Sequence, residues 1–160
     1  MIRPVRVLLI ASILAFGSLS IAASAKAPPE TPAGQDFLAR NAKAKGVVTT
    51  PSGVEYFVLA SGPASGARPS AADTVTLDYE VRLLSGQVID SSYATGQPLT
   101  GTAGQFVPGF SEAVQLMRPG DTWIVWVPPQ LGYGDKDVGP IPGNSVLRFK
   151  LALHSVTRAG

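Results

Sequence analysis

The sequence predicts an α+β fold in which a curved antiparallel β-sheet is half-wrapped around one short amphipathic helix. Two observations favour a sheet. Apolar and polar residues alternate with a period of two after residue 46, and 17 glycines and 14 prolines among 160 residues leave little room for long helices. A third observation identifies the helix, because beyond residue 46 only residues 108–117 have helical spacing. A sheet wrapped over this helix would bury its apolar face.

The first 25 residues have the pattern of a secretory signal peptide. Arg3 and Arg6 precede an apolar stretch over residues 7–21, and Ala23 and Ala25 flank Ser24 in the small-x-small pattern that signal peptidase reads. A membrane anchor is the alternative, but the apolar run is shorter than the roughly 20 residues that cross a bilayer. We therefore expect cleavage after Ala25, export to the periplasm and no stable membrane anchor.

Residues 26–45 are predicted to form a linker and a short N-terminal helix, followed by one domain over residues 46–160. The linker is rich in proline, and the helix over residues 35–45 ends at Gly46. No long helical arm that would pair two chains precedes the domain, so a monomer is expected. The strands are predicted from alternation and from the turns between them, at residues 54–59, 74–83, 87–90, 122–127 and 145–156. Residues 122–127 are apolar on both faces and should form a central strand.

Composition and charge exclude several classes of function. The chain has no cysteine and one histidine, so no disulfide, thiol nucleophile, metal site or cofactor is expected. That histidine, His154, falls on the outward face of the last strand, and Asp135 and Asp137 are too few carboxylates for a calcium site. Without residues 1–25 the chain carries 11 basic and 11 acidic side chains, so no nucleic acid partner is expected.

A set of aromatic and aliphatic residues at the ends of predicted elements is the candidate site. These residues are Tyr79, Ile89, Phe106, Val107, Phe110, Tyr133, Ile141 and Phe149. Two features indicate more than a core. Ile89 is followed at once by Asp90, whose charge needs a partner or a wet cleft. Tyr133 lies in a long glycine-rich loop that resembles a flap over a pocket rather than a tight turn.

Four motifs in order carry a family resemblance. They are LLSGQVIDSSYATGQP (83–98), FVPGFSEAVQLMRPGD (106–121), PPQLGYGD (128–135) and IPGNSVLRFKLALHSV (141–156). Together they resemble an FKBP-type peptidyl-prolyl cis-trans isomerase. The segment before them resembles the exported macrophage infectivity potentiator and FkpA-like branch of that family.

The resemblance implies an apolar pocket between helix and sheet that holds a substrate proline. Matched by position, Phe110 would be the floor, and the backbone N–H of Val107 would meet the bound chain. Asp90 and Tyr133 would be the polar pair at the rim, and the Tyr133 hydroxyl would bond a substrate carbonyl. The implied wall residues are Tyr79, Ile89, Leu99, Ile141 and Phe149, with Phe106 also expected to bind substrate. Partners would be proline-containing polypeptides and FK506- or rapamycin-type macrolides.

The sequence departs from the family pattern at four positions. Thr95 stands where an arginine usually pairs with the aspartate, so Asp90 is left to backbone donors, Tyr133 or water. Ile89, Leu99 and Phe110 replace larger aromatic residues, which implies a shallower pocket.

Isomerisation needs neither nucleophile nor metal, because the barrier of about 18–20 kcal/mol comes from amide resonance. Two alternatives stay open. One is a non-catalytic module or holdase of the same fold that binds proline-containing segments, and the other is a small exported β-rich domain whose aromatic residues are only core.

Overall fold

The structure, a computed structural model, describes residues 31–160. The predicted signal peptide and residues 26–30 of the predicted linker lie outside the described residues. Within the described part, no helix is both long and apolar enough to cross a bilayer. The elements in chain order are α1 (Pro32–Asn41), β1 (Val47–Thr49), β2 (Glu55–Ala60), β3 (Thr74–Leu83), β4 (Val88–Ser91), α2 (Ser92–Thr95), β5 (Leu99–Thr102), η1 (Ala103–Gln105), α3 (Pro108–Leu116), β6 (Thr122–Val127), η2 (Pro129–Leu131) and β7 (Leu147–Thr157).

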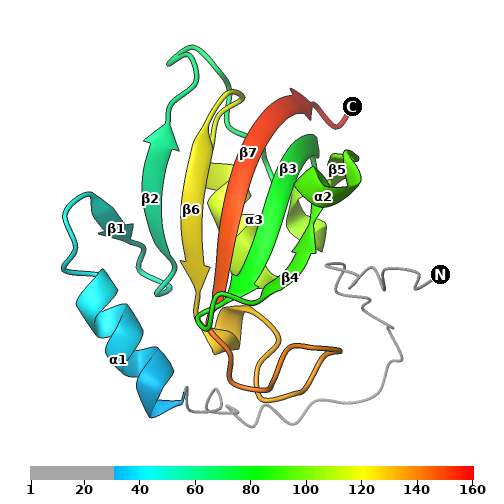
Figure 1. Cartoon of the computed structure of the whole chain (residues 1–160). Coiled ribbons are helices and arrows are strands. Elements are labelled where there is room, and N and C mark those ends of the chain that lie inside the picture. The colour runs from blue at the N-terminus through cyan, green and yellow to red at the C-terminus, as the bar shows by residue number, and fades with distance from the viewer. Residues whose placement is uncertain (1–30) are drawn as a thin grey trace, which may run out of the picture.

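One antiparallel sheet of seven strands organises the described chain (Figure 1). The strand order is β1-β2-β6-β7-β3-β4, and β5 pairs with β3 beside β4. The long strands β3 and β7 pair from Thr74 opposite Thr157 to Leu83 opposite Leu147. The predicted α+β fold is confirmed. The prediction that residues 122–127 form an interior strand is confirmed too, since β6 pairs with β2 on one side and β7 on the other.

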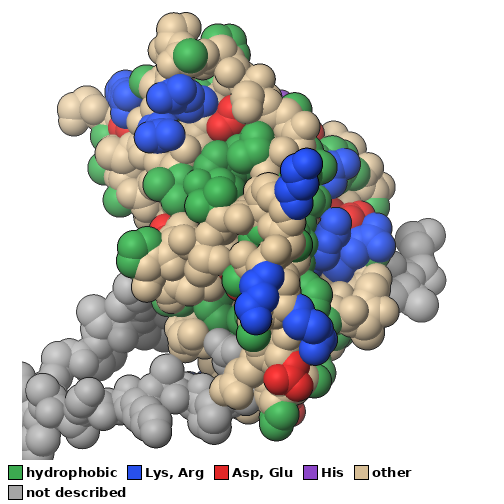
Figure 2. Space-filling model, turned by 90° about the vertical axis from the view of Figure 1, so that its left-hand side faces the viewer, with side chains coloured by type: hydrophobic (Ala, Val, Ile, Leu, Met, Phe, Trp, Pro, Cys, Tyr) green, Lys and Arg blue, Asp and Glu red, His purple; other side chains and the backbone are tan. Residues whose placement is uncertain are grey.

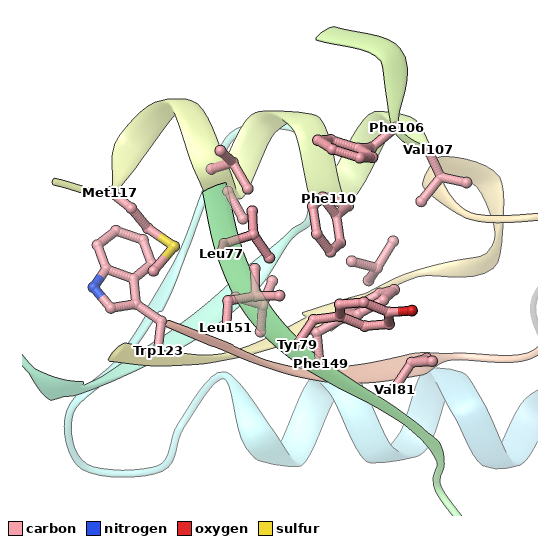
Figure 3. Close-up of a cluster of buried hydrophobic side chains, with 14 of the residues drawn as sticks. Leu77, Tyr79, Val81, Phe106, Val107, Phe110, Met117, Trp123, Phe149 and Leu151 are labelled. Atoms are coloured by element: carbon pink, nitrogen blue, oxygen red, sulfur yellow. The ribbon is translucent and has the colours of Figure 1, made fainter. Parts of the chain in front are cut away.

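The core lies between the concave face of the sheet and α3. Phe110, Ala113 and Val114 on α3, and Met117 directly after it, are fully buried. Gly109 allows the close approach, because a Cβ atom there would lie 2.4 Å from a Val127 methyl carbon on β6. The helix therefore contacts the sheet directly at its first turn, where the candidate site is (Figure 3).

The N-terminal helix begins and ends earlier than predicted. The Thr31 hydroxyl accepts a hydrogen bond from the Gly34 N–H at 3.2 Å, and Pro32 occupies the first turn, so α1 starts three residues before the predicted start. It lies on the side of the sheet opposite α3 (Figure 3). Its Phe37 ring packs against Trp126, with ring centroids 6.3 Å apart.

Besides the turns η1 and η2, three short elements were absent from the sequence prediction. Within residues 31–160, strand β1 pairs only with β2 and β5 pairs only with β3, and α2 is a single turn directly after β4. Each is four residues or fewer, too short for a periodicity signal. Their formation depends on a partner strand already in position.

A buried carboxylate joins the start of β3 to the C-terminus. Asp73 is 3 % exposed and accepts hydrogen bonds from the Ser70 N–H at 2.7 Å and the Ala159 N–H at 2.9 Å. The Arg158 guanidinium bonds it at 2.5 Å. These contacts, led by the two backbone amides, hold the pKa of Asp73 well below its usual range.

We expect Asp73→Asn to lower the free energy of unfolding in a pH-dependent way. Because the pKa is depressed in the folded state, the ionised carboxylate stabilises the fold above the unfolded value of about 3.9, and this stabilisation is lost as the pH falls below it. The free energies of unfolding of the wild type and the variant, measured in urea, should therefore differ most near neutral pH and converge in acid. Asp36→Asn, which changes an exposed carboxylate on α1, is the control. A pH-independent difference would show that the charge of Asp73 is not what stabilises the fold.

Candidate active site

The apolar floor of the candidate site is a group of three phenylalanines. The Phe110 ring lies 4.7 Å from Phe106 and 5.2 Å from Phe149, centroid to centroid, the second pair edge to face. Phe110 and Phe149 are fully buried and Phe106 is 4 % exposed. These rings lie at one end of the core, with Met117 and Trp123 at the other (Figure 3). The floor is therefore shielded from solvent, since Phe106 itself is almost completely buried.

The other apolar residues of the predicted site surround this floor at two depths. Ile141, Val107 and Tyr79 are buried, whereas Ile89 and Leu99 are only half-buried and pack against the same cluster. Val107 comes directly before α3, and its carbonyl accepts the Ser111 N–H. The structure thus brings the predicted apolar residues together. The part that a ligand can reach is formed by the half-buried side chains.

Asp90 is held at the edge of this cluster by two donors. The Tyr79 hydroxyl donates to one carboxylate oxygen at 2.5 Å, and the Ser91 N–H donates to the other at 2.8 Å. The phenol that pairs with Asp90 is thus Tyr79, not Tyr133. Thr95 bonds within its own helix, where its hydroxyl donates to the Ser92 carbonyl at 3.1 Å. The missing arginine is replaced by a neutral donor from β3 and a backbone amide.

Tyr133 supplies a polar group with no partner in the described chain. Its hydroxyl oxygen is shielded from solvent and makes no hydrogen bond within residues 31–160. Burial, and secondarily the negative charge of Asp90, raise the pKa of Tyr133. The phenol therefore stays protonated at neutral pH. A buried unpaired donor is costly, and a ligand carbonyl would satisfy it.

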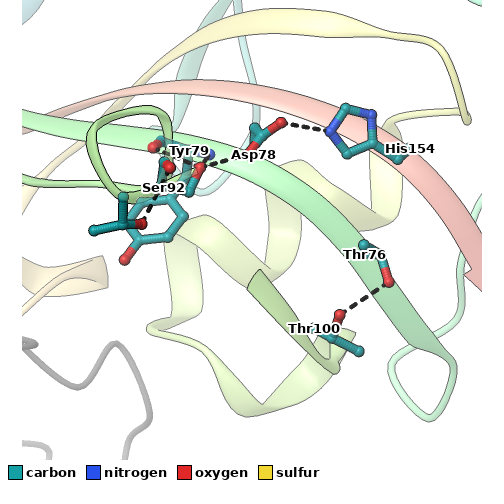
Figure 4. Close-up of polar contacts among 7 residues, drawn as sticks. Thr76, Asp78, Tyr79, Ser92, Thr100 and His154 are labelled. Atoms are coloured by element: carbon teal, nitrogen blue, oxygen red, sulfur yellow. Dashed lines mark hydrogen bonds and ion pairs between the residues drawn. The ribbon is translucent and has the colours of Figure 1, made fainter. Parts of the chain in front are cut away.

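A hydrogen-bonded chain behind Tyr79 was missed by the sequence prediction. The Ser92 hydroxyl, 2 % exposed, accepts the Tyr79 N–H at 2.9 Å and donates to Asp78 at 2.7 Å. Asp78 in turn lies 2.7 Å from the His154 ring (Figure 4). The only signal for Ser92 was its position two residues after Asp90.

This chain fixes the site rather than performing chemistry. The serine bonds to the carboxylate directly, with no imidazole between them to take its proton, so it is not a nucleophile of the Ser-His-Asp type. Its hydrogen bond, and then that of His154, lowers the pKa of Asp78 and keeps this carboxylate ionised. The pair Thr76 and Thr100, 3.0 Å apart, similarly ties β5 to β3 (Figure 4). Both contacts hold the segment from β4 to β5 against β3.

Residues 31–160 contain no group of three or more side chains that could hold a metal ion. Asp135 and Asp137 are exposed, and Asp137 accepts the Gly143 N–H at 2.7 Å across the loop that carries Tyr133. What the site offers is an apolar surface, a carboxylate and one unpaired phenol. Such a set can bind and polarise a neutral group.

Comparison with known proteins identifies the family. The profile of the FKBP-type peptidyl-prolyl cis-trans isomerase matches residues 66–154, and that of the domain amino-terminal to it matches residues 16–58. The outer membrane protein MIP of Legionella longbeachae is 43% identical over 135 residues, which are 84% of this chain and 57% of the relative. The isomerase FkpA of Aeromonas hydrophila is 40% identical over 125 residues, 78% of this chain and 46% of the relative.

Solved structures of the same family resemble this chain in fold. Escherichia coli FkpA superposes with a TM-score of 0.76 at 34% identity, covering 80% of this chain and 59% of that one. A peptidyl-prolyl cis-trans isomerase from Pseudomonas syringae gives a TM-score of 0.72 at 27% identity, covering 79% and 92%. The chain spans about half the length of the curated relatives named above. With the family profile over more than half of its residues, this chain belongs to the FKBP-type peptidyl-prolyl cis-trans isomerase family.

Proposed function

We propose that this protein is a peptidyl-prolyl cis-trans isomerase that accelerates the folding of exported polypeptides. The observation that carries the proposal is the unpaired Tyr133 hydroxyl beside Asp90 at the edge of a buried aromatic cluster. Family membership supports the same activity. In this proposal Asp90 and Tyr133 are the catalytic residues, and the predicted apolar residues bind substrate.

The reaction requires only that the twisted amide be favoured over the planar one. The planar amide is stabilised by a charge-separated resonance form, which gains less in an apolar environment than in water. The half-buried side chains Ile89 and Leu99 would provide that environment for the proline ring. The Tyr133 phenol would donate to a carbonyl of the substrate, and a donor placed for the twisted geometry stabilises the transition state selectively.

A second candidate is a binding module without catalysis. The observation in its favour is that Phe110 is fully buried and packs against Phe106, so the ring that would be the pocket floor contacts no solvent. A bound proline would then rest on the half-buried side chains alone. Such a shallow site would hold a proline without twisting its amide bond.

A protease-coupled assay with a short proline-containing peptide separates the two. The uncatalysed reaction takes about 10–100 s at room temperature. An isomerase should increase the rate of isomerisation in proportion to its concentration, and an FK506- or rapamycin-type macrolide should inhibit this catalysis. A binding module would raise the fluorescence anisotropy of a labelled peptide without changing the isomerisation rate. Catalysis that persists in a folded Asp90→Leu variant would place the site elsewhere.

Three further properties are proposed with the activity. We propose that residues 1–25 are a signal peptide, residues 26–45 a linker and short helix, and residues 46–160 the catalytic domain, with the processed protein in the periplasm. N-terminal sequencing of the processed form should then read Lys26 first, and an intact Met1 in the membrane fraction would contradict it.

We also propose a monomer, which light scattering should report as one chain mass.

A further inference from the structure

A groove lies on the outer face of the sheet, opposite the candidate active site. It has a volume of about 660 Å³ and runs between α1 and the β3–β4 hairpin, across β6 and β7. Known ligand sites have volumes of about 300–1,000 Å³. The lining residues used below are Phe37, Trp126, Leu84, Arg82, Arg148 and Lys150. Figure 2 faces the α1 and β1 edge of the molecule, and it shows Lys and Arg side chains on its right-hand side, toward which the outer face turns, as well as a separate group at its upper left.

The charges in the groove are unbalanced toward positive. Arg82 on β3 and Arg148 on β7 are directly opposite each other, an arrangement that is destabilising for like charges. Glu80 is the carboxylate among the lining residues, and it bonds the Arg82 Nε at 2.6 Å. Within residues 31–160 Arg148 makes no ion pair. A bound anion would relieve the repulsion between the two arginines.

All three cations of the groove lie close enough to Glu80 to lower its pKa. Its pKa is lowered first by the hydrogen bond from Arg82 and further by the charges of Arg148 and Lys150. A second carboxylate, Glu55 on β2, lies opposite Trp126 on β6. It is only 3 % exposed and accepts the Asn41 side-chain N–H at 2.7 Å. The solvent-facing part of the groove therefore carries three cations and one carboxylate.

The other wall of the groove is apolar. Phe37 and Trp126 form a tilted aromatic pair, and Leu84 at the hairpin is 40 % exposed. A free inorganic anion would use the cations and leave this wall uncovered. A ligand that uses both walls combines carboxylates with large apolar side chains, as an unfolded acidic segment of polypeptide does.

We propose that this groove binds a short acidic segment of unfolded polypeptide. Its carboxylates would bind Arg148, Arg82 and Lys150, and a neighbouring apolar side chain would pack on Phe37 and Trp126. Along β3 and β7 these cations alternate with Val81 and Phe149, which face the core beneath the candidate active site. The groove and the active site thus lie back to back across one sheet. If the proposed isomerase function holds, a client bound here would keep its prolines at a high local concentration near the active site.

Fluorescence anisotropy with labelled, proline-free peptides tests the proposal. One peptide alternates Asp and Glu with Phe and Leu, and its control replaces every carboxylate by the amide. The acidic peptide should bind more tightly, and its affinity should fall as salt is added, because exposed charges are screened. Arg148→Gln should weaken its binding by about fivefold. The matched control is Arg68→Gln, which removes an exposed arginine elsewhere and should leave the affinity within twofold of wild type.

Several outcomes would overturn the proposal. They are equal affinity for the acidic and amide peptides, or equal losses in Arg148→Gln and Arg68→Gln. Flotation with phosphatidylglycerol vesicles that depends on Arg148, without peptide binding, would assign the groove to a lipid surface. A dimer that Arg148→Gln dissociates would assign it to a second copy of the chain.

The proposal for the groove and the proposed isomerase function can be refuted independently of each other. Arg148→Gln should leave the rate on a short proline peptide unchanged, since the groove is on the opposite face from the active site. Acidic-peptide binding by a protein inactive on proline peptides would support the groove and refute the isomerase. Catalysis without acidic-peptide binding would do the reverse.

Discussion

Replacing Phe110 by alanine should both destabilise the protein and reduce its isomerase activity. The side chain is fully buried between Phe106 and Phe149, so its removal leaves a cavity that costs about 3–5 kcal/mol in the free energy of unfolding. The cavity lies directly beneath the residues proposed to hold the proline. Chemical denaturation measures the first effect, and kcat/KM per folded molecule measures the second.

Met117→Ala is the matched control for Phe110→Ala. Met117 is equally buried and follows the same helix, but it packs at the other end of the core near Trp123 (Figure 3). Its loss should cost about 2–5 kcal/mol and leave the activity of the folded fraction unchanged. If folded Phe110→Ala keeps the wild-type kcat/KM, Phe110 is a core residue only and the substrate site is elsewhere.

A larger ring at position 110 tests how tightly the floor is packed. Phe110→Trp adds volume to a closed site and should cost about 1–3 kcal/mol. The Phe106 ring packs against Phe110 at 4.7 Å, so Phe106→Val in the same chain should recover most of that loss. Failure of the second substitution to compensate would mean that another neighbour limits the space.

The substitution Asp90→Leu should remove most of the activity while the domain stays folded. Asp90 is half-buried at the rim and accepts the Tyr79 hydroxyl at 2.5 Å, so leucine removes the negative charge and releases the phenol from its position. A hydrogen bond to a charged group is worth about 1.5–3 kcal/mol, which corresponds to about a 10- to 100-fold loss in kcat/KM. Circular dichroism and urea unfolding check the fold. Undiminished activity in folded Asp90→Leu would exclude the proposed role.

Two tyrosine variants show how Asp90 acts. Tyr133→Phe removes one neutral donor and should reduce kcat/KM by about tenfold at most. If Asp90 works by holding Tyr79, Tyr79→Phe and Asp90→Leu should be non-additive, and the double variant should be little worse than Asp90→Leu alone. Additive losses would indicate that Asp90 acts on the substrate independently of Tyr79.

Much of the architecture could be predicted from sequence because its signals are local. The alternation along β3 and β7 specifies which side chains face the core. The helical spacing of Phe110, Ala113, Val114 and Met117 specifies the helix against which those side chains pack. These periods follow from backbone geometry and need no knowledge of distant residues. The order of four motifs then indicated the family.

The contacts of the polar groups could not be predicted in the same way. Asp90 was expected to find backbone donors, Tyr133 or water. The backbone donor is present as the Ser91 N–H, but the side-chain partner is Tyr79 from β3 and not Tyr133. Ser92 carries no periodic signal, yet it joins the Tyr79 backbone to Asp78. A polar side chain bonds whichever group the pairing of β3 with β4 brings within about 3 Å. That distance is set by strand register and the bulge in this pair, not by the residue types.

The sequence by itself determined that one amphipathic helix is covered by an antiparallel sheet and which apolar residues come together in the cluster of the candidate site. Only the tertiary structure decided what lies on the outer face. Arg82 is far in the sequence from Arg148 and Lys150, and the register of β3 with β7 places Arg82 opposite Arg148. The contact of α1 with Trp126 then adds an apolar wall. Side-chain direction repeats every two residues and can be read locally, whereas the neighbours across a sheet depend on how the whole chain is paired.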